Sequence, residues 1–219
     1  MQPTAFASAP APLAPHSPRL EQLRASPRST GEASFFFWDA NFKNEAVKVL
    51  PGEFFVSDED MLIVTTLGSC IAACLWDRER RIGGMNHFML PEGGDGSGRY
   101  GSYAMELLIN QLMKRGASRS TLEAKVFGGG AVIASMTSMN VGERNTQFVL
   151  DYLRTERIPV VSKDVLDHCA RKVCMLPASG KVLMKRLALT NADALLAQER
   201  AAAEKAAPQV TGGGSVDLF

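Results

Sequence analysis

The chain has 219 residues, of which 46% are hydrophobic and 21% charged, and its formal net charge at pH 7 is +1. Length and composition fit one globular domain with tails, and the near-neutral charge excludes a strong field toward nucleic acid or an anionic membrane. The N-terminal stretch lacks the basic and apolar regions of a secretory signal, and no apolar run reaches the length of a membrane span. We therefore expect a cytoplasmic protein with no nucleic-acid partner and no membrane insertion.

Segments of biased composition flank the expected domain. Residues 1–33 are rich in Pro, Ala and Ser, and such a composition buries too little apolar surface to offset chain entropy, so it predicts a disordered arm. The folded domain is expected over residues 34–188, beginning at the aromatic residues 35–38. Residues 189–219 are predicted to form an Ala- and Glu-rich helix followed by a flexible C-terminal tail.

The elements of the expected domain follow from its hydrophobic pattern. Apolar residues at helical spacing predict amphipathic helices over residues 103–115 and 143–157. Glycine-rich residues 91–99 predict a mobile loop. Many strands with two helices indicate an α+β fold, with a layered mixed β-sheet core and flanking helices. Short apolar runs predict the strands, at residues 48–57, 61–67, 70–76, 82–90, 122–127, 158–161, 171–176 and 181–187.

The candidate chemistry lies in the stretch 62–91. One β-like run leads to a Gly68-Ser69 bend and Cys70, and a second run of similar length carries His87. A thiol and an imidazole on adjacent strands are the minimal set for thiol catalysis, because the thiolate is the reacting species and a base must form it. N–H groups at the bend are suited to holding an oxyanion. The other two histidines lie in the predicted arm and in a polar stretch near the domain edge.

Simpler interpretations compete with this one. Free cysteine is among the most buried residue types, so Cys70 in a β run is also interpretable as a packing residue. Cys74 shares its strand face and is interpreted as core. A zinc site drawing on Cys70, Cys74, His87 and Cys169 matches none of the usual ligand spacings, so we expect no metal. These cysteines and Cys174 are not expected to form disulfides in a reducing cytoplasm.

Two further features bear on the same stretch. Thr65 and Thr66 precede the bend, and either hydroxyl is suited to orienting the histidine or hydrogen-bonding a substrate amide, although threonine is common in strands for packing reasons alone. Glycines 128–130 follow a predicted strand but lack the Lys-Ser/Thr of a P-loop and the spacing of a dinucleotide-binding fingerprint. We interpret these glycines as a place where the backbone closely approaches the site.

Four motifs that occur in order carry a family resemblance. Together they closely resemble the chemoreceptor glutamine deamidase family, CheD, and the likeness covers residues 48–187 but neither tail. The motifs are Thr-Leu-Gly-Ser-Cys at 66–70, Gly-Gly-Met-Asn-His-Phe-Met-Leu-Pro at 83–91, Phe-Gly-Gly-Gly-Ala at 127–131 and Asn-Val-Gly-Glu-Arg-Asn at 140–145.

The resemblance implies a cysteine-hydrolase-like enzyme, a protein-glutamine glutaminase. Such an enzyme deamidates glutamine side chains of methyl-accepting chemotaxis receptors through a glutamyl thioester, and it needs no cofactor. The resemblance places the nucleophile at Cys70, its histidine at His87 and an assisting threonine shortly before the cysteine. The Thr65-Thr66 doublet offers two positions for this threonine, of which we prefer Thr65. The resemblance also leads us to expect that the bend, at Gly68 and Ser69, binds the oxyanion or the substrate.

The resemblance also implies partners and exposes one departure. The expected partners are the receptors, as protein substrates, and a CheC-type CheY-phosphate phosphatase. Residues 164–171 depart from the pattern, because family members carry a Gly-Gly-containing segment before the arginine at this place, and the sequence here has no such pair. A rival from another class is a non-catalytic adaptor that binds chemoreceptors or the phosphatase; in an adaptor, Cys70 would be replaceable without effect on signalling.

Overall fold

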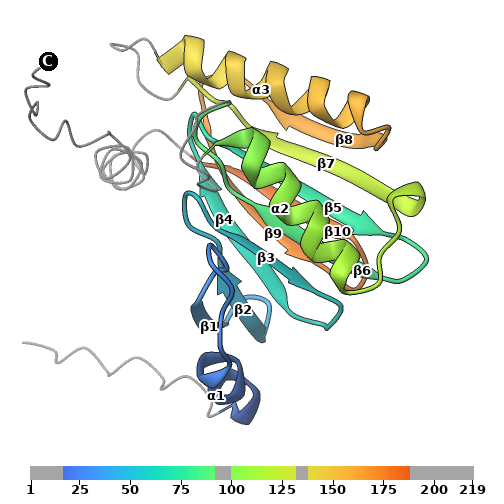
Figure 1. Cartoon of the computed structure of the whole chain (residues 1–219). Helices are drawn as coiled ribbons and strands as arrows, with labels where there is room; N and C mark the ends of the chain where they lie inside the picture. The colour runs from blue at the N-terminus through green and yellow to red at the C-terminus, as the bar shows by residue number, and fades with distance from the viewer. Residues whose placement is uncertain (1–16, 92–99, 132–137, 188–219) are drawn as a thin grey trace, which may run out of the picture.

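Two five-stranded β-sheets form the core of the protein in a computed structural model that describes residues 17–91, 100–131 and 138–187 (Figure 1). The strands are β1 (Phe35–Asp39), β2 (Asn44–Lys48), β3 (Phe54–Ser57), β4 (Leu62–Leu67), β5 (Ile71–Asp77), β6 (Ile82–Asn86), β7 (Leu122–Gly128), β8 (Val160–Val165), β9 (Ala170–Leu176) and β10 (Lys181–Leu187). Their order is β1-β2-β4-β9-β10 in the first sheet and β3-β6-β5-β7-β8 in the second. Each sheet contains one parallel pair, β2 with β4 and β7 with β8, so both sheets are mixed.

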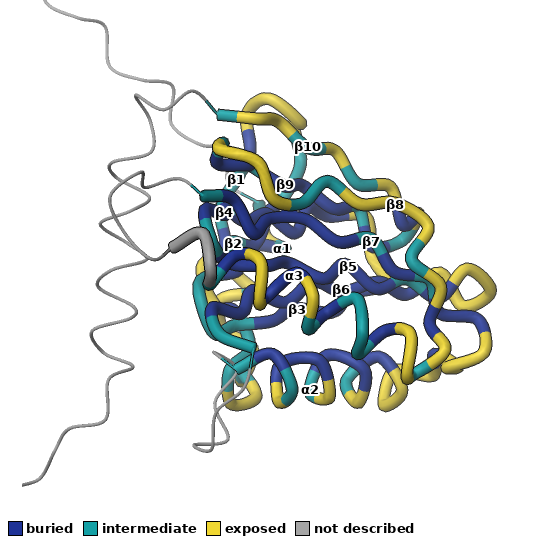
Figure 2. Tube along the Cα trace, turned by 90° about the horizontal axis from the view of Figure 1, so that it is seen from above, coloured by how far each residue is buried: buried dark blue, intermediate teal, exposed yellow. Residues whose placement is uncertain are grey.

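Helices cover the second sheet on the face that points away from the first. α2 (Gly101–Lys114) and α3 (Ser138–Thr155) form this layer, whereas α1 (Pro18–Ala25) lies beside β1 and a 3-10 helix (Arg119–Thr121) leads into β7 (Figure 1). Figure 2 shows α2 buried along the side that faces the sheet and exposed along the other side, as an amphipathic helix should be. No helix in the described residues is long and apolar enough to cross a membrane. The α+β fold class, a layered mixed-sheet core with flanking helices, is confirmed.

Strand β5 contributes to two separate cores. Ile71 and Leu75 belong to the core beneath α2 and α3. Ala72 and Cys74 belong to the core between the two sheets, together with Cys70, which directly precedes the strand. The alternation of a β-strand therefore places the candidate nucleophile between the sheets and away from the helices. It also confirms that Cys74 is a core residue.

The predicted elements agree with the structure where local pattern decides and differ where a turn intervenes. The helix predicted over residues 103–115 corresponds to α2, and the strand predicted over 61–67 corresponds to β4. A single strand over 48–57 is wrong, because the Pro51-Gly52 turn separates β2 from β3, and these two strands lie in different sheets. Gly52 has a positive φ of 88°, which lets the chain turn there.

The second half of the predicted disordered arm is ordered. α1 begins where the Ser17 hydroxyl accepts a hydrogen bond from the Leu20 N–H at 3.3 Å, and the Leu20 side chain is buried in the core between the sheets. The Arg28 guanidinium lies 4.6 Å from the centre of the Phe36 ring, so a cation–π contact attaches the segment after α1 to β1. The predictions for residues 1–16, 92–99 and 189–219 lie outside the described residues.

The loop that departs from the family pattern has a strained backbone. Leu166 and Asp167 have φ of 65° and 70°, the left-handed region that glycine enters freely and other residues enter at a cost of about 1 kcal/mol each. Three hydrogen bonds hold this path: Leu166 N–H to the Gly128 carbonyl at 2.8 Å, Ala131 N–H to the Asp167 carbonyl at 2.7 Å, and Arg171 Nη2 to the Leu166 carbonyl at 2.7 Å. The chain thus keeps a glycine-like conformation without glycine.

Leu166→Gly should therefore destabilise the protein less than the same change at a position with ordinary backbone. Both changes lose a partly buried leucine side chain and add the chain entropy of glycine, but only Leu166→Gly relieves left-handed strain, so we expect the two losses in the free energy of unfolding to differ by about 1 kcal/mol. Leu183→Gly is the matched control, because Leu183 is 37% exposed against 38% for Leu166 but lies in β10 with no positive φ. Urea unfolding should show the control destabilised more; an equal loss for both variants would contradict the strain argument.

Candidate active site

The chain crosses from one sheet to the other at the Gly-Ser-Cys bend. β4 ends at Leu67 in the first sheet, and β5 begins at Ile71 in the second. Irregular backbone inside a protein needs hydrogen-bond donors for its carbonyls. Each of the three bend carbonyls has one: Gly130 N–H donates to Gly68 O at 2.8 Å, Asn145 Nδ2 to Ser69 O at 3.2 Å, and Gly129 N–H to Cys70 O at 2.8 Å.

The glycines after β7 are required by this close approach. A Cβ on Gly128 would lie 2.1 Å from the Cys70 carbonyl oxygen, and Gly128 also has a φ of 111°. A Cβ on Gly142, in the first half of α3, would lie 2.4 Å from the Gly129 carbonyl oxygen. Side chains at these positions would push the glycine segment away from the bend and α3 away from the glycine segment. The interpretation of a close backbone approach agrees with this geometry.

The register of β5 and β6 brings Cys70 and His87 to one face. Cys74 pairs with Met85, and the same register continues to a bridge in which Ile71 and Phe88 exchange hydrogen bonds of 3.0 Å. His87 is therefore the diagonal cross-strand neighbour of Cys70, a spacing that long side chains can span. Both side chains lie between the sheets, where Cys70 is 3% and His87 1% exposed.

Thr65 of the opposite sheet fixes the tautomer of His87. Its hydroxyl lies 2.9 Å from His87 Nδ1 and donates its single proton to the Val49 carbonyl at 2.8 Å. The hydroxyl must then accept from Nδ1–H, which leaves Nε2 of the neutral imidazole with a free lone pair. His87 Nε2 is buried and has no hydrogen-bond partner within the described parts of the chain. Nε2 of the imidazole can therefore accept a proton in the protein interior.

Thr66 faces the other side of β4. Ile63, Thr65 and Leu67 alternate toward the core between the sheets, whereas Thr66 points outward and pairs in register with Lys172 of β9. The structure thus brings only Thr65 of the two threonines to His87. This contact agrees with the preference for Thr65, and the alternation with Ile63 and Leu67 is the sequence signal that distinguishes it from Thr66.

Burial keeps His87 neutral. Removal from water is the main cause that lowers its pKa to about 4; the nearby Val49 carbonyl raises the pKa and the Lys48 ammonium lowers it. A neutral imidazole at physiological pH is the form that serves as a general base. Burial acts on Cys74 in the opposite chemical sense, because it raises the pKa of that thiol and keeps it protonated and inert. The candidate base is thus available at neutral pH, and Cys74 is not a competing nucleophile.

Comparisons with known proteins identify the family. The family model described as CheD chemotactic sensory transduction matches residues 89–186. A relative from Albidiferax ferrireducens, named "Probable chemoreceptor glutamine deamidase CheD 1", is 63% identical over 203 residues, which cover 92% of this chain and 87% of the relative. The chain belongs to the CheD family. The resemblance carried by the four motifs is confirmed.

Other relatives extend the match. A CheD 1 protein of the same name from Dechloromonas aromatica is 56% identical over 168 residues, covering 74% of this chain and 84% of the relative. "Probable chemoreceptor glutamine deamidase CheD" from Thiobacillus denitrificans is 53% identical over 194 residues, which cover 85% of this chain and 96% of the relative. Among solved structures, the Bacillus licheniformis hypothetical protein YfiH aligns with 52% of this chain and 51% of its own at 11% identity and a TM-score of 0.35, too low to support an argument.

Asn145 is a site residue that sequence reasoning missed. Besides the Ser69 carbonyl, its Nδ2 donates to the Met89 carbonyl at 2.8 Å, and the residue is fully buried. It is the last residue of the CheD motif 140–145, for which the sequence alone predicts no role. A signal was present, because Asn145 precedes Val149 and Leu153 on the same buried stripe of α3, where an asparagine needs specific partners.

The residues weighed for a metal do not come together as a metal site. Among the described residues, no group of three or more His, Cys, Asp and Glu side chains is arranged to hold a metal ion. His168 instead lines a separate cavity of about 160 Å³ with Glu143 and Asp167. None of the four cysteines, all of which lie in the described part of the chain, is in a disulfide; Cys169 is half-buried and the others are buried. The candidate site, made up of Cys70, His87 and Thr65, therefore includes no metal-binding cluster among the described residues.

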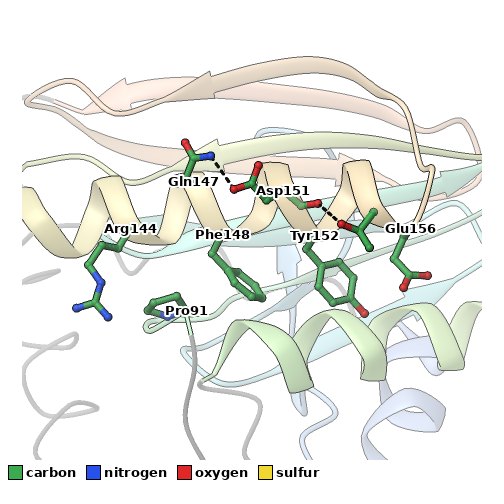
Figure 3. Close-up of a pocket in the computed structure, with 8 residues that line it drawn as sticks. Pro91, Arg144, Gln147, Phe148, Asp151, Tyr152 and Glu156 are labelled. Atoms are coloured by element: carbon green, nitrogen blue, oxygen red, sulfur yellow. Dashed lines mark hydrogen bonds between the residues drawn. The ribbon is translucent and has the colours of Figure 1, made fainter.

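An open pocket of about 540 Å³ runs along α3 beside the site (Figure 3). Its lining begins at Pro91, four residues after His87, and includes Arg144, the neighbour of Asn145. Figure 3 shows the rings of Phe148 and Tyr152 pointing from α3 toward α2. The lining contains neither the candidate cysteine nor the candidate histidine, so this pocket flanks the chemistry and does not contain it.

The low pKa of His87 predicts that the protein loses stability in acid. The unfolded histidine binds a proton below about pH 6.5, and the folded one binds it only near pH 4, so stability is complete above pH 6.5 and falls as the pH drops toward 4. Between pH 7 and pH 5 the loss should be on the order of 2 kcal/mol.

Urea unfolding at both pH values measures this loss. His87→Gln should remove that part of the acid dependence, whereas His168→Gln, at an exposed histidine, should retain it. An equal pH dependence in the wild type and His87→Gln would contradict the assignment of the effect to His87.

Proposed function

We propose that this CheD protein is a chemoreceptor glutamine deamidase, which hydrolyses selected glutamine side chains of methyl-accepting chemotaxis receptors to glutamate. Membership of the family and the names of its relatives support the reaction. One observation carries the assignment to this site: the Thr65–His87 hydrogen bond leaves Nε2 as a proton acceptor on the same face as Cys70. We assign Cys70 as nucleophile, His87 as base and acid, and Thr65 as the residue that orients His87.

The proposed reaction has two halves that share one histidine. The Cys70 thiol proton passes to His87 Nε2 as the sulfur attacks the glutamine amide carbon, and N–H groups of the bend between Gly68 and Cys70 hold the resulting oxyanion. The imidazolium then protonates the leaving nitrogen, and ammonia departs from a glutamyl thioester. Water gives a proton to His87 and attacks the thioester, which releases glutamate and restores the thiol. No cofactor enters these steps.

Burial supports a selective reaction of this kind. Cys70 is 3% exposed, so a substrate must reach it with a slim group such as an extended glutamine side chain. The imidazolium forms only beside a thiolate or an oxyanion, which offsets the cost of placing its charge in the interior. We place the reaction in the cytoplasm, where free thiols persist. On the family resemblance alone, a CheC-type CheY-phosphate phosphatase is proposed as a second partner.

Intact mass measures the proposed reaction directly. Incubation with a recombinant cytoplasmic fragment of a receptor from the same organism should add about 1 Da per modified glutamine, because an amide NH₂ is replaced by OH. Cys70→Ala should abolish the gain, whereas Cys74→Ala, at a buried cysteine on the same face, should retain it. Absence of a gain with every receptor of the organism would reject the enzyme and leave the adaptor interpretation.

The threonine pair provides a test of how His87 is oriented. Thr65→Val keeps the size of the side chain but removes the acceptor for Nδ1–H, so we expect kcat to fall by about 10–10²-fold. Thr66→Val, on the opposite face of β4, should leave kcat within about twofold. Initial rates of deamidation at saturating receptor distinguish the two, and a larger loss for Thr66→Val would overturn the assignment of Thr65.

A further inference from the structure

We propose that Asn145 is a positioning residue, whose side-chain amide sets the orientation of the Ser69–Cys70 peptide and ties the nucleophile bend to the strand that carries His87. The expected effect on deamidation rests on the proposed function, whereas the expected effect on the geometry of the Cys70 thiol does not. The inference is based on the hydrogen bonds of Asn145 to backbone carbonyls on both sides of the site.

The two hydrogen bonds of Asn145 go to residues next to Cys70, one along the chain and one across the strand pair. Ser69, whose carbonyl accepts at 3.2 Å, directly precedes Cys70; Met89, whose carbonyl accepts at 2.8 Å, lies opposite Cys70 in the continued register of β5 and β6. Both partners are carbonyl oxygens, so only the NH₂ end of the asparagine can face them, and its two protons match two acceptors. One side chain thus fixes the distance between the thiol-bearing bend and the segment after His87.

The Ser69 contact also determines where the next N–H points. In a trans peptide the C=O and the following N–H are antiparallel, and the described chain contains no cis peptide. Since Asn145 draws the Ser69 carbonyl toward α3, the Cys70 N–H is directed away from the helix. The same peptide plane sets the backbone of Cys70 and hence the direction of its side chain. The orientation of the Ser69–Cys70 peptide therefore determines both the position of the Cys70 sulfur and the direction of the Cys70 N–H.

α3 is a rigid support for this contact. One turn after Asn145, the Phe148 ring meets the Phe88 ring edge-on at 6.0 Å between ring centres, and Phe88 is the residue bridged to Ile71. Figure 3 shows Phe148 projecting from α3 in the same direction as Tyr152. The helix thus contacts both site segments through Asn145 and contacts the segment after His87 a second time, by packing of the Phe148 ring on Phe88.

Stability alone does not explain an asparagine here. Its Oδ1 is buried and has no hydrogen-bond partner within the described residues, which is unfavourable in a protein interior. Asparagine also has weak helix propensity. What this position gains from asparagine is a rigid two-proton donor aimed at two backbone carbonyls, and that gain is largest where the carbonyls flank the reacting group.

The test compares Asn145→Ala and Asn145→Asp with Thr121→Val. The aspartate variant keeps the shape but turns a carboxylate toward the two carbonyls, and the alanine variant removes both hydrogen bonds. Thr121→Val is the matched control, because it removes the buried 2.7 Å hydrogen bond from Thr121 Oγ1 to Asp77 at the opposite end of β5. Asn145→Ser, which retains one donor of shorter reach, is the conservative variant.

Four quantities are measured on folded protein: kcat and KM for the receptor fragment, the pH profile of Cys70 alkylation by iodoacetamide, and the melting temperature. In Asn145→Ala we expect kcat to fall by about 10²-fold with KM changed by less than about threefold. The alkylation profile should move toward that of an ordinary cysteine. Asn145→Asp should lose at least as much, Asn145→Ser should recover part of the rate, and Thr121→Val should lower only the melting temperature.

Other outcomes would contradict either the positioning role of Asn145 or the proposed deamidase function. A folded Asn145→Ala with wild-type kcat and a wild-type alkylation profile would overturn the positioning role. Failure of all three Asn145 variants to fold would make the residue structural and would overturn it as well. If wild type never adds mass to a receptor but the alkylation profile still moves in Asn145→Ala, the proposed deamidase function fails and the positioning of the thiol stands.

Discussion

The passage of the chain between two stacked sheets is the constraint on which the site depends. A strand that leaves one sheet and enters the other exposes irregular backbone to the interior, and each carbonyl there needs a donor from elsewhere. At residues 68–70 the donors are two backbone N–H groups of the glycine segment and one side chain of α3. The turn that carries Cys70 is thus stabilised by hydrogen bonds from elements that are distant in the sequence. Its position places the Cys70 side chain on the face of the sheet where His87 lies.

Burial also determines the protonation state of His87, the candidate base. In the space between the sheets the imidazole is neutral, and the Thr65 hydroxyl, whose proton is committed to the Val49 carbonyl, assigns that neutral ring one tautomer. Loss of the thiol proton to Nε2 would leave the Nδ1–H bond to Thr65 intact, so the ring need not turn during the reaction. A fixed acceptor in a dry interior costs little reorganisation when charge develops.

Much of this could be predicted from the sequence, and the limits are physical. Cys70 and His87 could be predicted as a pair because two neighbouring β-like runs and the CheD motifs point to them, whereas the choice of Thr65 over Thr66 follows from the side-chain alternation seen in β4. Sheet order was not accessible, since β3 and β4 are consecutive yet lie in different sheets. The buried stripe of α3 indicates that Asn145 needs hydrogen-bond partners, but no local pattern identifies them, because they lie 76 and 56 residues away.

The loop at 166–167 shows how far this dependence on distant support extends. Its carbonyl and N–H groups hold the glycine segment that in turn holds the Cys70 carbonyl, and the fully buried Arg171 side chain holds the loop through the Leu166 and Cys169 carbonyls. Left-handed Leu166 and Asp167 keep the path that two glycines would adopt without strain. The hydrogen bonds of the loop thus support, through the glycine segment, the bend that carries Cys70. The geometry of the candidate site is in this sense a property of both sheets and α3 together.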